Sequence, residues 1–315
     1  MDLVFFGTPQ FAVPTLERLI ESGFHVRLVL TQPDRPRGRG LEVAPSPVKQ
    51  RALELGLAVA QPDKVKTNDA LREQLAALTP AAIIVVGYGR ILPRWIIDLP
   101  RYGCINLHAS LLPKYRGAAP VQWAIARGET LTGVTTMRID EGLDTGDILL
   151  QQKAAISPDD TTLTLEPRLA AIGAELMVQT LRGLSAGTIA PLPQDSKAAS
   201  LAPLLKKGDG RIDFAWTAGE IHNRLRGFQP WPGVFTSFRE KVLFFRSARP
   251  VSLEEAPPAP GEVAVRGNRL LVGCGGGTAL EVLELQPEGK KRLAAGDFLH
   301  GYRLRGGERL GDEAR

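Results

Sequence analysis

Residues 3–31 read LVFFGTPQFAVPTLERLIESGFHVRLVLT, in which two apolar runs, 3–6 and 26–31, enclose a segment with the pattern of an amphipathic helix, 11–22. Strands that are apolar throughout are typical of a parallel sheet that helices cover on both faces. We therefore predict that this stretch forms a strand–helix–strand unit of an α/β domain.

The same alternation continues to residue 188. It predicts two further buried strands, 81–86 and 104–108, and two helices, 48–55 and 69–78. A helix at 121–127, a strand pair at 133–139 and 147–155 and a long helix at 163–184 follow. We expect Pro167 in the opening turn of the long helix, where a missing N–H is tolerated. In a doubly wound sheet of this kind, ligands bind beyond the carboxyl ends of the strands.

The pattern changes after residue 188. The proline-rich stretch 190–196, APLPQDS, has the composition of a linker. After a helix at 218–226 come short strands with Gly and Pro turns, which we place at 234–238, 242–247, 261–265, 269–272 and 279–285. Such strands predict a small β-barrel or sandwich. We therefore divide the chain into a domain at 1–188, a linker at 189–205 and a second domain at 206–315.

Charge and composition narrow the class of protein. The 315 residues carry 39 Lys and Arg against 34 Asp and Glu, and residues 204–249 hold nine basic and four acidic side chains, a balance that permits polyanion binding. The longest apolar run, 81–87, is far shorter than the ~18 residues of a membrane span, and the first residues lack the pattern of a signal peptide. Cys104 and Cys274 match no metal or redox spacing, so we expect a cytoplasmic protein.

Glycines near the strand ends do not form a dinucleotide-binding fingerprint. The turn 7–12, GTPQFA, has one glycine, and 87–92, GYGRIL, lacks the third glycine of G-x-G-x-x-G. No acidic residue ends the second strand, where a ribose partner belongs. The sequence therefore disfavours a nicotinamide or flavin cofactor.

Residues 104–113, CINLHASLLP, hold the first candidate site. Asn106 and His108 are two positions apart on a predicted strand, so both side chains point to the same face near its carboxyl end. An amide and an imidazole placed together can stabilise a carbonyl oxygen as it becomes an oxyanion. The alternative is that the two side chains only satisfy nearby backbone groups.

A second segment, 140–147, reads DEGLDTGD and favours the catalytic interpretation. It lacks the twelve-residue pattern of a calcium loop. Asp144, which lies between two glycines, is the candidate carboxylate partner of His108, whereas the other acids suit a solvated turn. The sequence contains no G-x-S-x-G elbow for a nucleophile, no H-E-x-x-H motif for zinc and no phosphate-binding loop. We therefore expect direct transfer between two bound substrates.

NLHASLLP at 106–113 and DEGLDTGD at 140–147 resemble the signature of 10-formyltetrahydrofolate-dependent formyltransferases. Five other stretches are similar to the branch of that family that acts on methionyl-tRNA: GTPQFA at 7–12, TQPDRPRGRG at 31–40 with PSPVK at 45–49, KKGDGRIDF at 206–214, NRLRGFQPWPG at 223–233 and LQPEGKK at 285–291. The resemblance covers nearly the whole chain.

This resemblance implies a doubly wound parallel-sheet formyltransferase domain followed by a small OB-like β-barrel domain. It implies formyl transfer from 10-formyltetrahydrofolate, the co-substrate, to the α-amino group of methionine on initiator methionyl-tRNA, without a metal or a membrane and by a monomer. The implied catalytic residues are Asn106, His108 and Asp144. The implied folate-binding residues are Ser110, Leu111, Leu112, Pro113, Arg90, Ile91 and Leu92. The implied tRNA-binding residues are Arg35, Arg37, Arg39, Lys206, Lys207, Lys290 and Lys291.

Three other functions stay open. A formyltransferase of the same fold could act on glycinamide ribonucleotide, although such an enzyme needs no basic second domain. One that acts on an amino sugar nucleotide could carry an extra domain, but it would leave the arginine-rich loop and the GKK segment unexplained. A non-catalytic RNA-binding relative would not need Asn106, His108 and Asp144 together. A hydrolase would release formate from 10-formyltetrahydrofolate without an amine acceptor.

Overall fold

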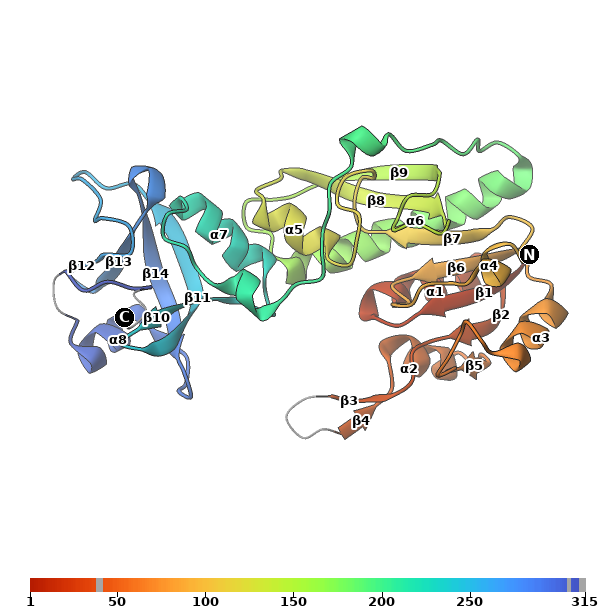
Figure 1. Ribbon diagram of the computed structural model, residues 1–315, viewed down its shortest axis with the longest axis horizontal. Helices are drawn as coiled ribbons and strands as arrows, with labels where there is room; N and C mark the ends of the chain where they lie inside the picture. Colours follow the sequence, from red (N-terminus) through yellow and green to blue (C-terminus); the bar gives the residue numbers. More distant parts are fainter. Residues whose placement is uncertain (38–41, 305–306, 312–315) are drawn as a thin grey trace. The chain divides into compact units, whose positions relative to one another are not determined.

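The computed structural model describes residues 1–37, 42–304 and 307–311, and the chain divides into two compact units (Figure 1). Unit 1 comprises Met1–Pro120, Leu131–Ala155 and Glu166–Pro203. Unit 2 comprises Val121–Thr130, Ile156–Leu165 and Leu204–Arg315. The stretch 189–203, which has the composition of a linker, thus belongs to unit 1.

Unit 1 is built on one seven-stranded sheet of order β5-β2-β1-β6-β7-β8-β9. The strands are β1 (Asp2–Gly7), β2 (His25–Leu30), β5 (Val59–Ala60), β6 (Ala82–Val86), β7 (Cys104–His108), β8 (Leu131–Arg138) and β9 (Ile148–Ala155). The first five are parallel, and β8 and β9 extend the sheet antiparallel. The chain runs outward from β1 to β5 and returns to β6 on the other side of β1, which confirms the predicted doubly wound fold.

Helices bury both faces of this sheet. They are α1 (Val13–Glu21), α2 (Pro47–Glu54), α3 (Asp69–Leu78), α4 (Arg94–Ile97) and most of α6 (Thr162–Ala186), with a 3-10 turn at Gln10–Ala12. Val4 and Phe6 of β1 pack in one cluster with Leu71 of α3. Leu3 and Phe5 point to the opposite face and are equally inaccessible to solvent. Burial on both faces explains why β1 is apolar throughout.

Pro167 lies inside α6, five residues after its first residue, Thr162, so the expectation of an opening-turn position is wrong. Proline removes the N–H that would bond to the carbonyl of Leu163, four residues earlier. Leu163 is exposed, so water can replace that donor. The helix therefore continues through a residue that usually ends one.

A short hairpin, β3 (Arg35–Arg37) and β4 (Glu42–Ala44), rises from the region between β2 and α2. The sequence pattern did not predict these strands. Arg35 is exposed on β3, and the backbone of Arg37 ends the strand. Arg39, expected to contact tRNA, lies outside the described residues, as does the side chain of Arg37.

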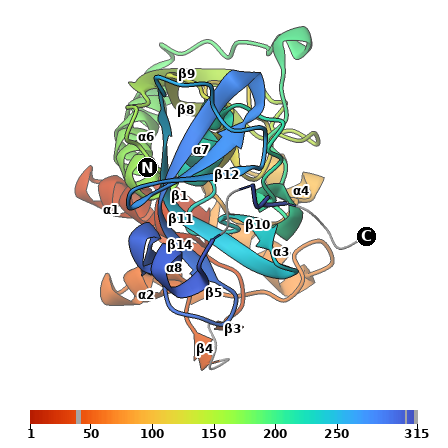
Figure 2. The same ribbon diagram turned by 90° about the vertical axis from the view of Figure 1, so that its left-hand side faces the viewer.

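Unit 2 is an antiparallel sheet of order β10-β11-β14-β13-β12, with β15 beside β14. Figure 2 labels β10, β11, β12 and β14 of this sheet. Its strands are β10 (Val234–Phe238), β11 (Lys241–Val251), β12 (Val263–Arg266), β13 (Arg269–Cys274), β14 (Thr278–Pro287) and β15 (Leu293–Ala294). Its helices are α5 (Pro120–Ala126), α7 (Ala218–Gly227) and α8 (Ala295–Tyr302), and its 3-10 turns lie at Lys207–Gly210 and Gly275–Gly277. A further 3-10 turn, Ser196–Ala198, belongs to unit 1. The predicted β-rich second domain is thereby confirmed.

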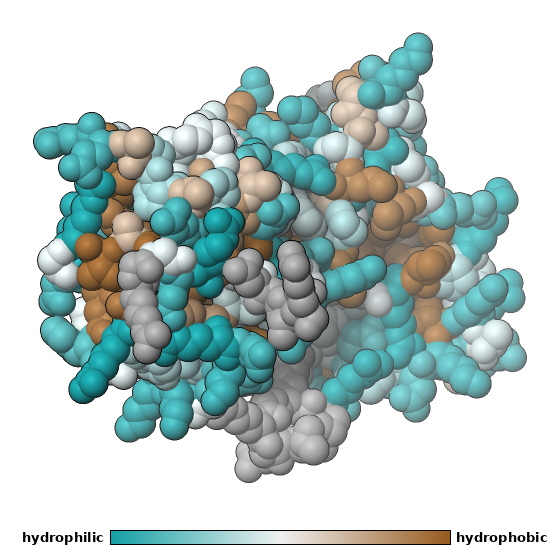
Figure 3. Space-filling view, turned by 60° about the vertical axis from the view of Figure 1, so that its left-hand side comes forward, coloured by the Kyte–Doolittle hydropathy of each residue, from teal (hydrophilic) through white to brown (hydrophobic). Residues whose placement is uncertain are grey.

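Hydrophilic side chains cover most of the face shown in Figure 3. Within the described ranges, no helix has both the length and the apolar character needed to cross a bilayer.

Candidate active site

The candidate site lies at the carboxyl end of β7, the strand that carries Asn106 and His108. Cys104, Ile105 and Leu107 are buried and fix the strand between β6 and β8. Asn106 is half-buried and stands opposite Val85 and Met137, while the last residue, His108, is 5% exposed. The sheet therefore delivers an amide and an imidazole from one strand to the edge where doubly wound sheets bind ligands.

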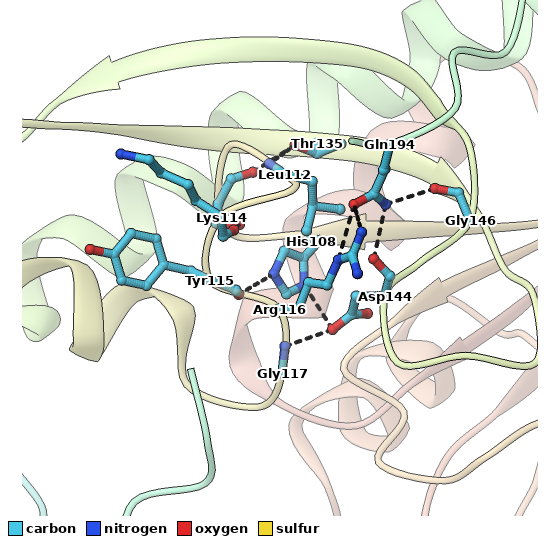
Figure 4. A network of polar contacts seen from close by, with 11 residues as sticks. His108, Leu112, Lys114, Tyr115, Arg116, Gly117, Thr135, Asp144, Gly146 and Gln194 are labelled. Atoms are coloured by element: carbon cyan, nitrogen blue, oxygen red, sulfur yellow. Dashed lines mark hydrogen bonds and ion pairs between the residues drawn. The ribbon is translucent and has the colours of Figure 1, made fainter. Parts of the chain in front are cut away.

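Two acceptors hold the ring of His108 (Figure 4). Its Nε2 lies 2.8 Å from the carbonyl oxygen of Tyr115, and its Nδ1 lies 3.7 Å from Oδ2 of Asp144. Both ring nitrogens can donate only when the imidazole is protonated. The ring is therefore held between a backbone carbonyl and a carboxylate at the end of β7.

Asp144 is fixed from two sides. The backbone N–H of Gly117 donates to its Oδ2 at 2.8 Å, the same oxygen that faces His108. Asp144 and Tyr115, the two residues that contact the ring, have backbone φ angles of +52° and +63°. Such left-handed conformations are uncommon outside glycine, cost about 1–3 kcal/mol and cluster at functional sites.

Gln194 completes this arrangement, although it lies in no motif that would point to it. Its Nε2 donates to the backbone carbonyls of Asp144 at 2.9 Å and Gly146 at 2.7 Å. Its Oε1 accepts from Nε and Nη2 of the buried Arg116 at 3.1 and 2.8 Å. Gln194 thus ties the loop that carries Asp144 to the loop that follows His108 (Figure 4).

We expect Gln194→Met to lower kcat about tenfold, because the Asp144 loop loses two donors while Arg116 loses its acceptor. Gln194→Glu keeps the acceptor for Arg116 but replaces the donors by a carboxylate oxygen that repels the two carbonyls, so an equal or larger loss of kcat in this variant would assign the effect to the Asp144 loop. Steady-state kinetics with separate KM values for both substrates checks this. A kcat within twofold of the parent in both variants would contradict the positioning role.

The loop after β7 holds four predicted folate-binding residues. Ser110 is fully buried, with its hydroxyl donating to the carbonyl of Lys114 at 2.6 Å. Leu112 is buried in a cluster with Met137 and Ile148. Leu111 is half-buried and Pro113 follows a cis peptide bond. The side chains of Ser110 and Leu112 are therefore buried and stabilise the conformation of the loop.

Thr135 and Gln151 support this loop from β8 and β9. The hydroxyl of Thr135 donates to the carbonyl of Ser110 at 2.6 Å and accepts from the N–H of Leu112 at 3.2 Å. The amide of Gln151 donates to the carbonyl of Leu112 at 2.9 Å. Neither residue was singled out in the sequence, because neither lies in a motif.

The other predicted folate-binding residues follow β6. Leu92 is buried in the cluster that contains Tyr88, whereas Ile91 is 91% exposed. Arg90 lines a cavity together with Arg35. The structure thus places three consecutive residues in three different environments.

The predicted tRNA-binding lysines all lie in unit 2. They are exposed and come from two stretches, one beside the 3-10 turn Lys207–Gly210 and one between β14 and β15. These residues are Lys206, Lys207, Lys290 and Lys291.

The cysteine thiols are unsuited to covalent catalysis. Burial raises the pKa of Cys104 to about 12, and it raises the pKa of Cys274 to about 12 as well. Since the thiolate is the nucleophile, both thiols are inert at neutral pH. Within the part of the chain that the structure describes, no three His, Cys, Asp or Glu side chains are grouped as metal ligands.

Known proteins match the chain along both of its units. Residues 1–181 match the family model described as formyl transferase, and residues 204–303 match that of its C-terminal domain. The methionyl-tRNA formyltransferase of Koribacter versatilis is 60% identical over 99% of this chain and 99% of that protein. That of Acidobacterium capsulatum is 58% identical over 99% of this chain and 100% of that protein.

The fold also recurs among solved structures. An N-formyltransferase from Helicobacter canadensis, in complex with folinic acid and dTDP-3-aminofucose, aligns with a TM-score of 0.67 at 19% identity, covering 90% of this chain and 98% of that one. This likeness concerns the fold alone. Family models over both units and close relatives over the full length lead to one conclusion: the chain belongs to the formyltransferase family, among its methionyl-tRNA formyltransferases.

Proposed function

We propose that this chain transfers the formyl group of 10-formyltetrahydrofolate to the α-amino group of methionine on initiator methionyl-tRNA, giving formylmethionyl-tRNA for translation initiation. The observation that carries the proposal is the His108 ring, held between the carbonyl of Tyr115 and the carboxylate of Asp144 at the end of β7. High identity to methionyl-tRNA formyltransferases over the whole length supports the choice of acceptor.

In this reaction the neutral amine attacks the formyl carbon, and negative charge develops on the formyl oxygen. Asn106 and His108 are the donors that stabilise that charge, each contributing about 10²-fold or more to the rate. The C–N bond to methionine forms, the bond to N10 of the folate breaks, and the proton lost by the amine replaces the formyl group on N10. Asp144 holds His108, and the two side chains relay that proton to N10, directly or through water.

Basic side chains would hold the tRNA through its phosphates. We assign this role to Arg35, Arg37 and Arg39 of the hairpin region, and to the four lysines of unit 2. Each Lys or Arg that neutralises a phosphate makes the affinity for tRNA fall more steeply as the salt concentration rises. The loop 110–113 and the exposed Ile91 would border the folate. The protein would act as a monomer in the cytoplasm, where the two free, buried cysteines remain reduced.

The test is incubation of the purified chain with 10-formyltetrahydrofolate and methionylated initiator tRNA. We expect formylmethionine on the initiator and at least about tenfold less on methionylated elongator tRNA, a discrimination that corresponds to ~1.4 kcal/mol. Mass spectrometry of the released amino acid measures both.

Other products would point to other functions. Formate released without formylated tRNA would indicate a hydrolase. Formylation of an amino sugar nucleotide in place of methionine would assign a different acceptor. Either result would overturn the proposal.

A further inference from the structure

One segment of unit 1, residues 192–202, contacts both loops of the candidate active site. At its start, Leu192 and Ile148 exchange two backbone hydrogen bonds of 2.8 Å, directly after the loop that carries Asp144. Gln194 then donates to the backbone carbonyl of Asp144. We call this segment the strap, because its other end is hydrogen-bonded to the loop that follows β7.

Ser200 of the strap fixes the loop that contacts His108. Its Oγ accepts from the N–H of Tyr115 at 2.9 Å, and its carbonyl accepts from the N–H of Arg116 at 2.8 Å. The N–H of Ala202 donates to the carbonyl of Arg116 at 2.7 Å. Because the carbonyl of Tyr115 belongs to the same planar peptide group as the N–H of Arg116, these bonds set its direction toward Nε2 of His108.

The strap also lies against Gly117, which holds Asp144. Gly117 has φ +120°, and a Cβ there would lie 2.7 Å from the carbonyl oxygen of Ala202. Only glycine therefore lets the loop pass so near the strap. The N–H of Gly117 donates to Oδ2 of Asp144 at 2.8 Å. One tripeptide, 115–117, thus holds the imidazole and the carboxylate, and the strap holds the tripeptide.

The strap leads into unit 2 by a short connection. Ala202 is fully buried, and Leu205, which belongs to unit 2, is 6% exposed. Only Pro203 and Leu204 lie between them. Two residues add no more than about 7 Å of extended chain, and proline fixes one of the φ angles. A displacement at the start of this part of unit 2 therefore reaches the strap with little slack.

We propose that Ser200 is a positioning residue through which tRNA held by unit 2 raises kcat. The inference rests on the proposed function. Lys206 and Lys207, to which we assign tRNA phosphates, follow the short connection directly, and the methionyl end of the same tRNA reacts beside His108. A tRNA that engages both points binds most tightly the arrangement in which the strap holds the tripeptide in place. Binding energy from phosphates far from the formyl group then appears in kcat as well as in KM.

The first test compares Ser200→Ala with the conservative variant Ser200→Thr and the matched control Ser196→Ala. Ser196 is an exposed serine of the same strap. We expect Ser200→Ala to lower kcat with methionylated initiator tRNA about tenfold, the effect of about one lost hydrogen bond, with KM for both substrates within twofold of the parent. Ser200→Thr keeps the hydroxyl acceptor and should recover most of kcat, and the control should change neither constant. A kcat within twofold of the parent in Ser200→Ala would overturn the proposal.

The second test asks whether the lysines act through the strap. A variant with Lys206→Gln and Lys207→Gln, assayed at saturating tRNA, should lower kcat by about fivefold, which is the lower end of typical coupling between sites. Adding Ser200→Ala should then cost less than it costs in the parent, because changes along one path are not additive. If the lysine variant raised only KM, unit 2 would bind tRNA without acting on the chemical step, and the proposal would fail. Both lysines are exposed, so this variant stays informative if Ser200→Ala lowers stability.

Hydrogen exchange gives a readout that needs no formyl transfer. Uncharged initiator tRNA should slow exchange in residues 113–119 of the parent about fivefold, since the strap protects the amides of Tyr115 and Arg116. Ser200→Ala should bind this tRNA with a Kd within twofold of the parent and yet lose that slowing. Equal slowing in both proteins would assign the effect to direct contact with tRNA and would overturn the proposal.

These measurements keep the coupling separate from the proposed function. If tRNA slows exchange through Ser200 but the parent formylates no methionyl-tRNA, the proposed function fails and the coupling stands. If the parent formylates initiator methionyl-tRNA while tRNA leaves exchange in residues 113–119 unchanged, the coupling fails and the proposed function stands.

Discussion

Replacing His108 by asparagine is expected to lower kcat for formyl transfer by about 10²–10⁴-fold, the range of a positioned general acid–base group. The ring contacts the carbonyl of Tyr115 and faces the carboxylate of Asp144, so it is the link through which a proton can leave the amine. Asparagine retains a donor of smaller size but cannot take up a proton at neutral pH. Single-turnover kinetics with saturating substrates measures the chemical step.

The matched variant is Asp144→Asn, which keeps the shape of the side chain and can leave the contact with Gly117 intact. We expect a loss of similar size, and a double variant that is little worse than either single one, because groups that act as a unit are not additive. Thermal unfolding and tRNA binding should be unchanged. A loss below tenfold for His108→Asn, with the fold intact, would rule out a proton-transfer role.

Local patterns were sufficient to predict the central part of the fold and of the site. The apolar run at 3–6 predicted a strand that is buried on both faces, and β1 is buried in this way. The two-residue spacing of Asn106 and His108 fixed them on one face of β7. Asp144 was found because flanking glycines and clustered acids mark a tight loop, and that loop lies within ion-pair distance of the ring.

Contacts between distant segments could not be predicted in this way. Gln194 reaches the carbonyl of Asp144 from 50 positions away, out of a stretch whose prolines indicate a linker. Arg116 meets Gln194 across 78 positions. Neither residue has a periodic or motif signal, since its role depends on the packing of the segment that carries it.

The division into two units likewise depends on contacts between distant segments. Residues 121–130 and 156–165 belong to unit 2 although the chain around them builds unit 1. Arg226 of α7 explains part of this, because its Nη1 donates to the carbonyl of Asp160 at 2.8 Å. The hydroxyl of Thr162 likewise donates to the carbonyl of Gly227 at 2.6 Å. Both acceptors are backbone carbonyls, which every residue has, so the amino-acid sequence does not reveal these two contacts.

Gly146→Ala is expected to lower kcat about 10²-fold, the cost of displacing a catalytic group by about 1 Å. A Cβ at this position would lie 2.0 Å from the carbonyl oxygen of Arg138 at the end of β8, and backbone cannot yield as a flexible side chain does. The loop must therefore move away, and it carries Asp144 two residues earlier. The same crowding should lower the free energy of unfolding by about 1–3 kcal/mol.

Gly301→Ala is the matched control, because nothing in the described structure beyond the adjoining residues and backbone of α8 lies within 4 Å of a Cβ at that position. It should leave kcat unchanged and, in a helix, should not lower stability. Denaturant unfolding and kcat measured on both variants separate the two effects of crowding. If Gly146→Ala lost stability while kcat stayed within twofold of the parent, the Asp144 loop would tolerate displacement, and the geometry around His108 would be less restrictive than its contacts indicate.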